Sequence, residues 1–252
     1  NKTKMRYTIF GSCMAYPSHG TEEATDNWGR HFDERHPNNI RWYMNYEQNN
    51  LQIAVHVMLM SKADSINIVQ LSPLHRAVFI DSESPRTVNL ISGQIAGACW
   101  SDTKPRLGNN GQYVECTWQD KMNMLDDNDL SEHYRTTNNE KDKAYIKAYQ
   151  DRNYVAQGKW ELQTAIAMID AHAKATGHDI RIIPQKTRDH EYNTLSQLNK
   201  LQLKEIENIY NSDRIFWYTN KNGQKLGCRH YPKHDLDEIV DNHLQPWLDK
   251  DI

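Results

Sequence analysis

Short runs of β-branched and aromatic residues recur in the first part of the chain. These runs are residues 5–10 (MRYTIF), 40–44 (IRWYM) and 66–71 (INIVQL). The first run ends at Gly11 and the third ends at Ser72-Pro73, where turn-forming residues stop a strand. The pattern therefore predicts three β-strands.

Two stretches between these runs have apolar residues at helical spacing. One begins near Thr21, carries Trp28 and Phe32, and stops before Pro37. The other begins at Asn49 and has enough apolar positions for a mostly buried helix. Strands that alternate with helices favour a parallel sheet, and right-handed crossovers place the helices on its two faces. The sequence therefore predicts an α/β fold.

The remainder of the chain returns to this alternation after an interruption. Residues from about 82 to 140 are rich in turn formers, which predicts an irregular insertion. The patterns after it predict helices at about 140–154, 159–176, 195–210 and 235–249, a strand at 179–184, and a last strand or buried loop at 214–218. We expect residues 1–252 to form a single domain.

Composition limits the partners and the compartment. The formal net charge is −3, and no basic cluster is present, so we expect neither nucleic-acid nor membrane binding. The cysteines form no CxxC pair, which fits a reducing compartment. The N-terminal residues contain no apolar stretch with a cleavage site, so we expect no secretory signal and a soluble cytoplasmic or virion-associated protein.

The turn Gly11-Ser12-Cys13 follows the first predicted strand. Ligands of open parallel sheets bind at the carboxyl ends of the strands, so this turn is the first place to look for chemistry. A helix that follows would present free amide donors, which lower a thiol pKa and stabilise an oxyanion.

These residues resemble the opening block of SGNH/GDSL hydrolases, in which Gly-Asp-Ser follows the first strand and Ser is the nucleophile. The chain reads Phe-Gly-Ser-Cys-Met-Ala-Tyr-Pro over residues 10–17. This is similar to Phe-Gly-Cys-Ser-Phe-Thr-Tyr-Gly in a branch common in phage and marine bacterial sequences, and to Gly-Ser-Cys-Phe-Ala in the related GSCFA family. The resemblance implies a three-layer, doubly wound, flavodoxin-like sheet.

Later blocks resemble the same family. Asn50 matches the Asn of its Gly-x-Ser-Asn element, while Glu47 stands where the family has Gly. Residues 68–76 are similar to the third-strand segment of the phage branch. Residues 229–234, before the last predicted helix, resemble the terminal Asp-x-x-His-Pro block, with Gly227 in the place of the Asp.

The resemblance implies candidate catalytic residues. Cys13 is in register with the family's nucleophile, and Ser12 would face the site if the turn were one residue tighter; alternatively, Cys13 only fills the turn. The base is His230 or, second, His234, with Asp235 or Asp237 as a possible orienting acid.

Further residues would line the same cleft. Gly11 and Asn50 belong to the oxyanion region, and Arg76 follows the third strand. We expect no cofactor, since no nucleotide-binding glycine loop is present. We expect no metal, since His31 with His36 and His172 with His178 lack a metal-ligand spacing.

The implied function is hydrolysis of small O-acyl esters, with glycan esters as one substrate class, by a nucleophile–histidine mechanism. An acyltransferase could use the same nucleophile. The alternative is a catalytically degenerate binding or structural module, for example a phage-particle component, that contacts other subunits through the insertion at 82–140. The missing Asp, the Ser–Cys order and Glu47 favour that alternative.

Overall fold

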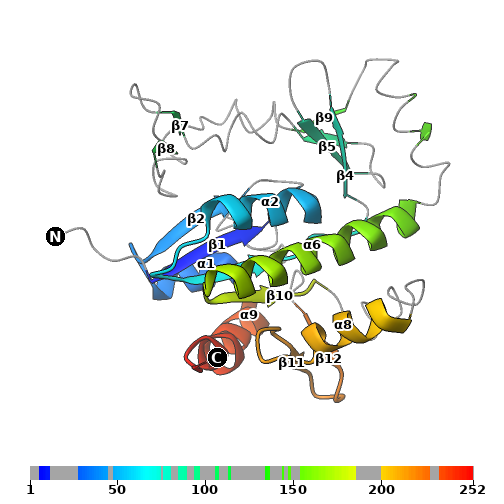
Figure 1. Cartoon of the computed structure of the whole chain (residues 1–252). Coiled ribbons are helices and arrows are strands. Elements are labelled where there is room, and N and C mark those ends of the chain that lie inside the picture. The colour runs from blue at the N-terminus through cyan, green and yellow to red at the C-terminus, as the bar shows by residue number, and fades with distance from the viewer. Residues whose placement is uncertain are drawn as a thin grey trace.

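The structure of the chain is a computed structural model (Figure 1). It describes residues 6–11, 28–44, 48–74, 76–80, 85–89, 94–96, 106–107, 113–114, 134–136, 144, 147–148, 154–185, 200–227 and 233–251.

A parallel sheet of four strands forms the centre of the fold. Its members are β1 (Tyr7–Gly11), β2 (Ile40–Met44), β3 (Ile66–Gln70) and β10 (Ile180–Ile183), in the order β10-β3-β1-β2. Ile215 adds a parallel bridge to Ile182 at the outer edge of β10. The predicted α/β class is confirmed, and each of these strands lies where the apolar runs place it.

Alternate residues of β1 enter two separate cores, as expected for a strand with side chains on both faces of a sheet. Tyr7 and Ile9 pack with helix α1 (Trp28–Arg35) and with the C-terminal helical segment. Phe10 packs on the other side, against the helices α2 (Asn50–Met60), α6 (Tyr154–Thr176) and α8 (Lys200–Tyr210). Helices therefore cover both faces of the sheet (Figure 1).

The C-terminal helical segment was predicted as one continuous helix but contains three elements. They are α9 (Lys233–Ile239), a π-helical turn η2 (Val240–Leu244) and α10 (Gln245–Leu248). Arg181 of β10, which is 2% exposed, fastens this segment to the sheet. Its guanidinium donates hydrogen bonds to the carbonyl oxygens of Trp247, Leu248 and Lys250 and is bound by the Asp179 carboxylate.

The chain between β3 and α6 contains more order than the sequence predicts. Four strands form an antiparallel sheet in the order β4 (Arg76–Ile80), β5 (Pro85–Asn89), β6 (Gln94–Ala96), β9 (Tyr134–Thr136). A further pair in this stretch is β7 (Arg106–Leu107) with β8 (Tyr113–Val114). A separate hairpin, which follows α8, pairs β11 (Tyr218–Thr219) with β12 (Lys225–Leu226). Much of the expected insertion at 82–140 lies outside the described residues.

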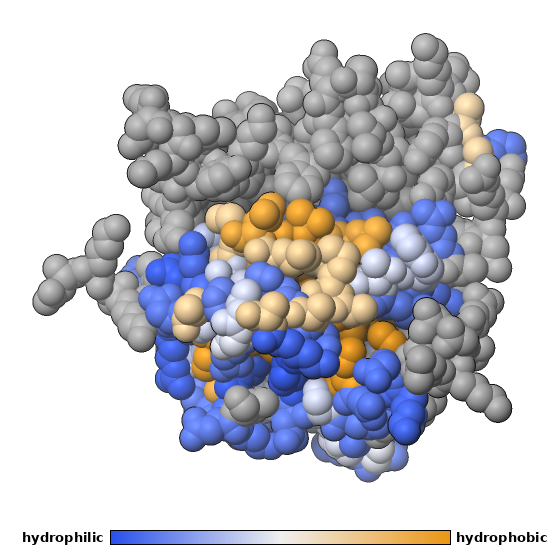
Figure 2. Space-filling model, viewed as in Figure 1, coloured by the Kyte–Doolittle hydropathy of each residue, from blue (hydrophilic) through white to orange (hydrophobic). Residues whose placement is uncertain are grey.

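An apolar patch lies on the surface over α2 (Figure 2). Met58 and Leu59 near the end of this helix are 43% and 69% exposed, because α2 has apolar residues on all sides and only part of its circumference is covered. Among the helices of the described residues, none combines the length and the hydropathy needed to cross a bilayer.

Candidate functional site

The carboxyl ends of β1 and β3 lie side by side where the strand order reverses. From β1 the chain passes outward to β2 and then returns across β1 to β3. Gly11 is the last residue of β1 and pairs with Met44 of β2, whereas Phe10 pairs with Val69 of β3. Crevices at such reversal points are the usual ligand sites of open parallel sheets. Gly11, the residue of the predicted turn that the structure describes, therefore lies at the carboxyl edge of the sheet, where a ligand site is expected.

Asn50 is joined to the end of β3 by two hydrogen bonds. Its Oδ1 accepts from the backbone N–H of Ser72 at 2.7 Å, and its Nδ2 donates to the Ser72 carbonyl oxygen at 3.0 Å. The two residues are only 2% and 3% exposed. The Ser72 hydroxyl also donates to the Gln48 carbonyl oxygen. Helix α2 therefore begins at a fixed position beside the β1 and β3 ends.

The first turn of α2 is closed by a capping box. The side chain of Asn49 accepts from the backbone N–H of Gln52, and the Gln52 side chain accepts from the backbone N–H of Asn49. This reciprocal cap satisfies amide groups that would otherwise lack partners. The Asn-x-x-Gln spacing is visible in the sequence.

Glu161 of α6 reaches this cap from the neighbouring helix. It is 7% exposed, and its carboxylate accepts hydrogen bonds from Asn49 Nδ2 at 3.1 Å and Gln157 Nε2 at 3.0 Å. Burial raises the pKa of the Glu161 carboxyl, although both hydrogen bonds act to lower it. A carboxylate close to the N-terminus of α2 also has a favourable interaction with the helix dipole.

A buried histidine completes the polar layer around Asn50. Nε2 of Gln48 lies 3.0 Å from Nδ1 of His56, and the two residues are almost fully buried. His56, Ser72 and Glu161 belong to this layer but are not predicted from the sequence as its members. Ser72 is detectable as the residue that ends the third apolar run, but a helical His or Glu at ordinary spacing gives no such signal.

The candidate residues are brought together only in part. Gly11 and Asn50 both lie at the carboxyl edge of the sheet. Arg76, which is 7% exposed, opens β4 after the loop that contains Ser72, and its backbone N–H donates to the Pro73 carbonyl oxygen at 3.4 Å. The side-chain placement of Asn50 is fixed by Ser72.

The remaining candidates fall outside what the structure describes. Ser12, Cys13 and His230 lie outside the described residues. His234 belongs to α9, but its side chain is not among those described. The approach of a thiol or hydroxyl to an imidazole therefore stays a prediction.

Asp237, one of the two possible orienting acids, has other partners. Its carboxylate lies 2.7 Å from Nδ1 of buried His31 and 3.0 Å from a guanidinium nitrogen of Arg35, and both partners belong to α1. Partial burial acts to raise the pKa of Asp237, but the hydrogen bonds and charges of His31 and Arg35 outweigh it and lower that pKa. Asp237 therefore joins α9 to α1.

Three histidines of the pairs that lack a metal-ligand spacing contact neutral groups, whereas the fourth, His31, contacts the Asp237 carboxylate. Nε2 of His36 lies 2.7 Å from the Gln245 side-chain oxygen. His172 and His178 both contact the Ser61 hydroxyl, at 2.8 and 2.9 Å. Burial, together with the nearby His178, lowers the pKa of His172.

The fold and this site define an α/β protein with a buried polar layer at the carboxyl edge of its parallel sheet. Comparison of the chain with protein-family models, with curated proteins and with solved structures gave no significant match.

Proposed function

We propose that the chain is an ester hydrolase of the SGNH/GDSL type that removes small O-acyl groups, with glycan esters as the substrate class. The observation that supports it most is the double hydrogen bond between Asn50 and Ser72 beside Gly11. It fixes a side-chain amide at the strand ends where the family resemblance expects an oxyanion donor.

The topology supports the finer fold proposal, a three-layer and doubly wound sheet. Read outward from β2, the order is β2-β1-β3-β10, and the bridge at Ile215 extends it beyond β10. The same order of parallel strands is found in flavodoxin-like sheets, in which ligands bind at the reversal point.

The proposed reaction has two steps. The Cys13 thiolate, or the Ser12 hydroxyl deprotonated by His230, attacks the acyl carbon, and His230 donates a proton to the departing alcohol. Water then attacks the acyl-enzyme, and His230 removes a proton from that water. The bond from the acyl carbon to the nucleophile breaks as the carboxylic acid leaves; Cys13 departs as the thiolate beside protonated His230, whereas Ser12 takes the proton back from His230. During both steps the backbone N–H of Cys13 and the second Nδ2 proton of Asn50 would stabilise the oxyanion.

Turnover of p-nitrophenyl acetate and acetylated xylo-oligosaccharides tests this proposal. Cys13→Ala and His230→Ala are each expected to lower kcat by roughly 1,000-fold or more. Cys116→Ala and His178→Ala are matched controls that should retain activity. Ser12→Ala against Cys13→Ser identifies the nucleophile. If the unmodified protein hydrolyses none of these esters, the proposal is wrong.

The second candidate is a binding or structural module that has lost catalysis. Glu47 and Gly227 stand where the family has Gly and Asp, and Asn50 already donates one Nδ2 proton to the Ser72 carbonyl oxygen. Inactivity together with a stable assembly through residues 82–140, measured by light scattering and hydrogen exchange, would favour this candidate. We also propose that the protein is located in the cytoplasm or in a virion.

A further inference from the structure

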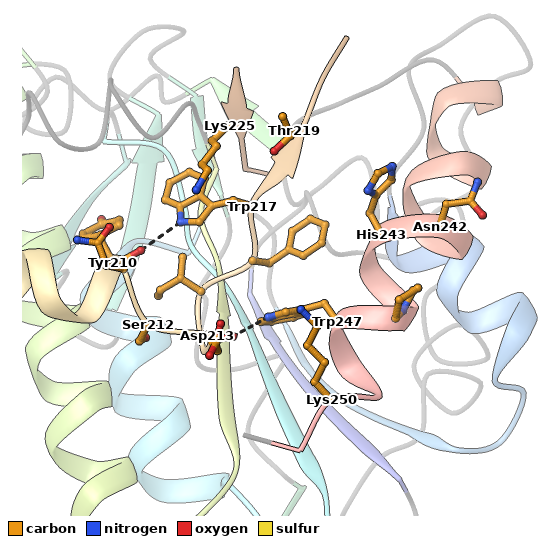
Figure 3. A pocket seen from close by; sticks show the side chains of 14 residues that line it. Tyr210, Ser212, Asp213, Trp217, Thr219, Lys225, Asn242, His243, Trp247 and Lys250 are labelled. Atoms are coloured by element: carbon orange, nitrogen blue, oxygen red, sulfur yellow. Dashed lines mark hydrogen bonds between the residues drawn. The ribbon is translucent and has the colours of Figure 1, made fainter. Parts of the chain in front are cut away.

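A groove of about 450 Å³ lies at the outer edge of the sheet, beyond β10 (Figure 3). One side is formed by Trp217, Thr219 and Lys225, and the other by Asn242 and His243. Its volume lies within the range of small-molecule sites, roughly 300–1,000 Å³. Since β3 lies between β10 and β1, the groove is separate from the Gly11 edge.

Trp217, Phe216 and Trp247 line the groove, and hydrogen bonds fix the two indole rings. Trp217 is half-buried, whereas Phe216 and Trp247 are only 4% and 7% exposed and belong to the core beneath the groove. Phe216 and Trp247 pack against each other with ring centroids 5.3 Å apart. The Trp247 indole N–H donates to the Asp213 carbonyl oxygen at 2.7 Å, and the Trp217 indole N–H donates to the Tyr210 carbonyl oxygen at 3.3 Å. Such rings are already ordered before a ligand binds, which lowers the entropic cost of binding.

Basic groups stand around these rings. Lys225 lies at one end of the groove and Lys250 near the other, with His243 on the helical side (Figure 3). Both lysines are exposed, and within the described part of the chain no carboxylate forms an ion pair with either of them. Asp213 is the acidic residue of the lining. The groove therefore favours a ligand with negative charge.

The remaining polar groups are suited to several hydroxyl groups. Asn211, Asn242, Ser212 and Thr219 line the groove. The Ser212 hydroxyl donates to the Ile209 carbonyl oxygen at 2.7 Å, so it is left to accept from a ligand. Amides and hydroxyls both donate and accept hydrogen bonds, as sugar hydroxyls require. The C–H face of a pyranose ring packs on an aromatic side chain, and a carboxylate on that ring would pair with a lysine.

From this combination we propose that the groove binds an acidic sugar, a pyranose that carries a carboxylate. The partly exposed ring of Trp217 packs on the apolar face of the sugar, the amides bind its hydroxyls, and Lys225 and Lys250 bind the carboxylates of successive residues. This site goes beyond ester hydrolysis and does not depend on it, because none of the residues that argue for it is a proposed catalytic residue.

Isothermal titration of the full chain with trigalacturonate and with neutral galactotriose tests the site. Trigalacturonate is expected to bind, and Lys225→Ala and Lys250→Ala are each expected to weaken it about tenfold, since a charge-assisted hydrogen bond contributes about that factor. Lys221→Ala, in the turn of the β11–β12 hairpin and not among the residues that line the groove, is the matched control and should bind normally. The indole N–H signal of Trp217, assigned with Trp217→Phe, should shift on binding.

Three outcomes would overturn the proposal. They are no binding of trigalacturonate, equal binding of the neutral trisaccharide, and equal competition by inorganic phosphate, which would show a general anion site. Cys13→Ala should bind trigalacturonate as well as the unmodified chain does, so loss of hydrolysis and loss of sugar binding are distinguishable.

Discussion

The Asn50 side chain is bound to both backbone groups of Ser72, with its oxygen 2.7 Å from the nitrogen and its own nitrogen 3.0 Å from the carbonyl oxygen. The Asn50 side chain replaces a neighbouring strand as hydrogen-bond partner, because it pairs with the N–H and C=O of Ser72, just past the end of β3. The polar layer of the candidate site is therefore also part of the framework.

Replacing Asn50 should therefore destabilise the fold. Asn50→Ala leaves the N–H and C=O of Ser72 buried without these partners, which should lower the free energy of unfolding by about 3 kcal/mol. Urea denaturation followed by circular dichroism measures the change. Asn208→Ala, on the exposed side of α8, is the control and should change stability by less than about 0.5 kcal/mol. Equal stability of the two variants would contradict the structural role of Asn50.

Arg181 should contribute far more to the free energy of unfolding than the surface arginine Arg6. Arg181→Met removes the donor for three carbonyl groups of the C-terminal segment and leaves Asp179 unpaired, so a loss of about 3 kcal/mol or more is expected. Arg6→Ala breaks an ion pair with Asp249 whose side chains are 54% and 50% exposed, which should cost less than about 1 kcal/mol. Hydrogen exchange should show residues 245–251 losing protection in the first variant alone.

The Glu161 carboxyl should make stability fall as the pH rises. Because its pKa is raised in the folded state, that state binds the proton more tightly than the unfolded chain does. Stability is then lost as the pH increases from about 4.5 through the raised pKa. Glu161→Gln should flatten this part of the curve, and urea midpoints at acidic and neutral pH measure it. Glu205→Gln, on the exposed side of α8, controls for the removal of one charge; the same flattening there would contradict the assignment.

Gly158 should tolerate no side chain. A Cβ at this position of α6 would lie 2.3 Å from the Leu74 carbonyl oxygen, so the helix and the loop after β3 would have to separate. Gly158→Ala should lower the free energy of unfolding by about 3 kcal/mol. Gly177 has a φ of +69° but open space around it, so Gly177→Ala should cost only about 1 kcal/mol. Thermal denaturation of both variants compares the cost of steric crowding at Gly158 with the cost of the positive φ at Gly177. A larger loss of stability for Gly177→Ala would refute this explanation.

The framework of the fold was readable from local patterns. The run at 40–44 predicts β2 (Ile40–Met44) to the residue, since apolar strands between polar turns leave little choice of boundary. The antiparallel strands after β3 were missed because short runs among turn formers have weak intrinsic signals and depend on their partners. The π-helical turn at Val240–Leu244 is not predicted either, because the spacing of apolar residues does not distinguish it from an α-helix.

The sequence predicts only the part of the candidate site that lies at the carboxyl ends of the parallel strands. Gly11 and Asn50 could be placed at one edge because parallel strands end together. Glu161 joins Asn49 across 112 positions, and Asp237 joins His31 across 206. Such contacts depend on which helices pack together, and the spacing of residues along one helix does not predict that.

The attachment of the C-terminal segment has a consequence for folding kinetics. The hydrogen bonds of His31 with Asp237 and of Tyr7 with Gln245 span 206 and 238 positions, so each closes a loop that contains most of the polypeptide. Contacts of such separation raise the contact order and slow the rate-limiting step. We therefore expect refolding to be slow, with the docking of this segment among its last events.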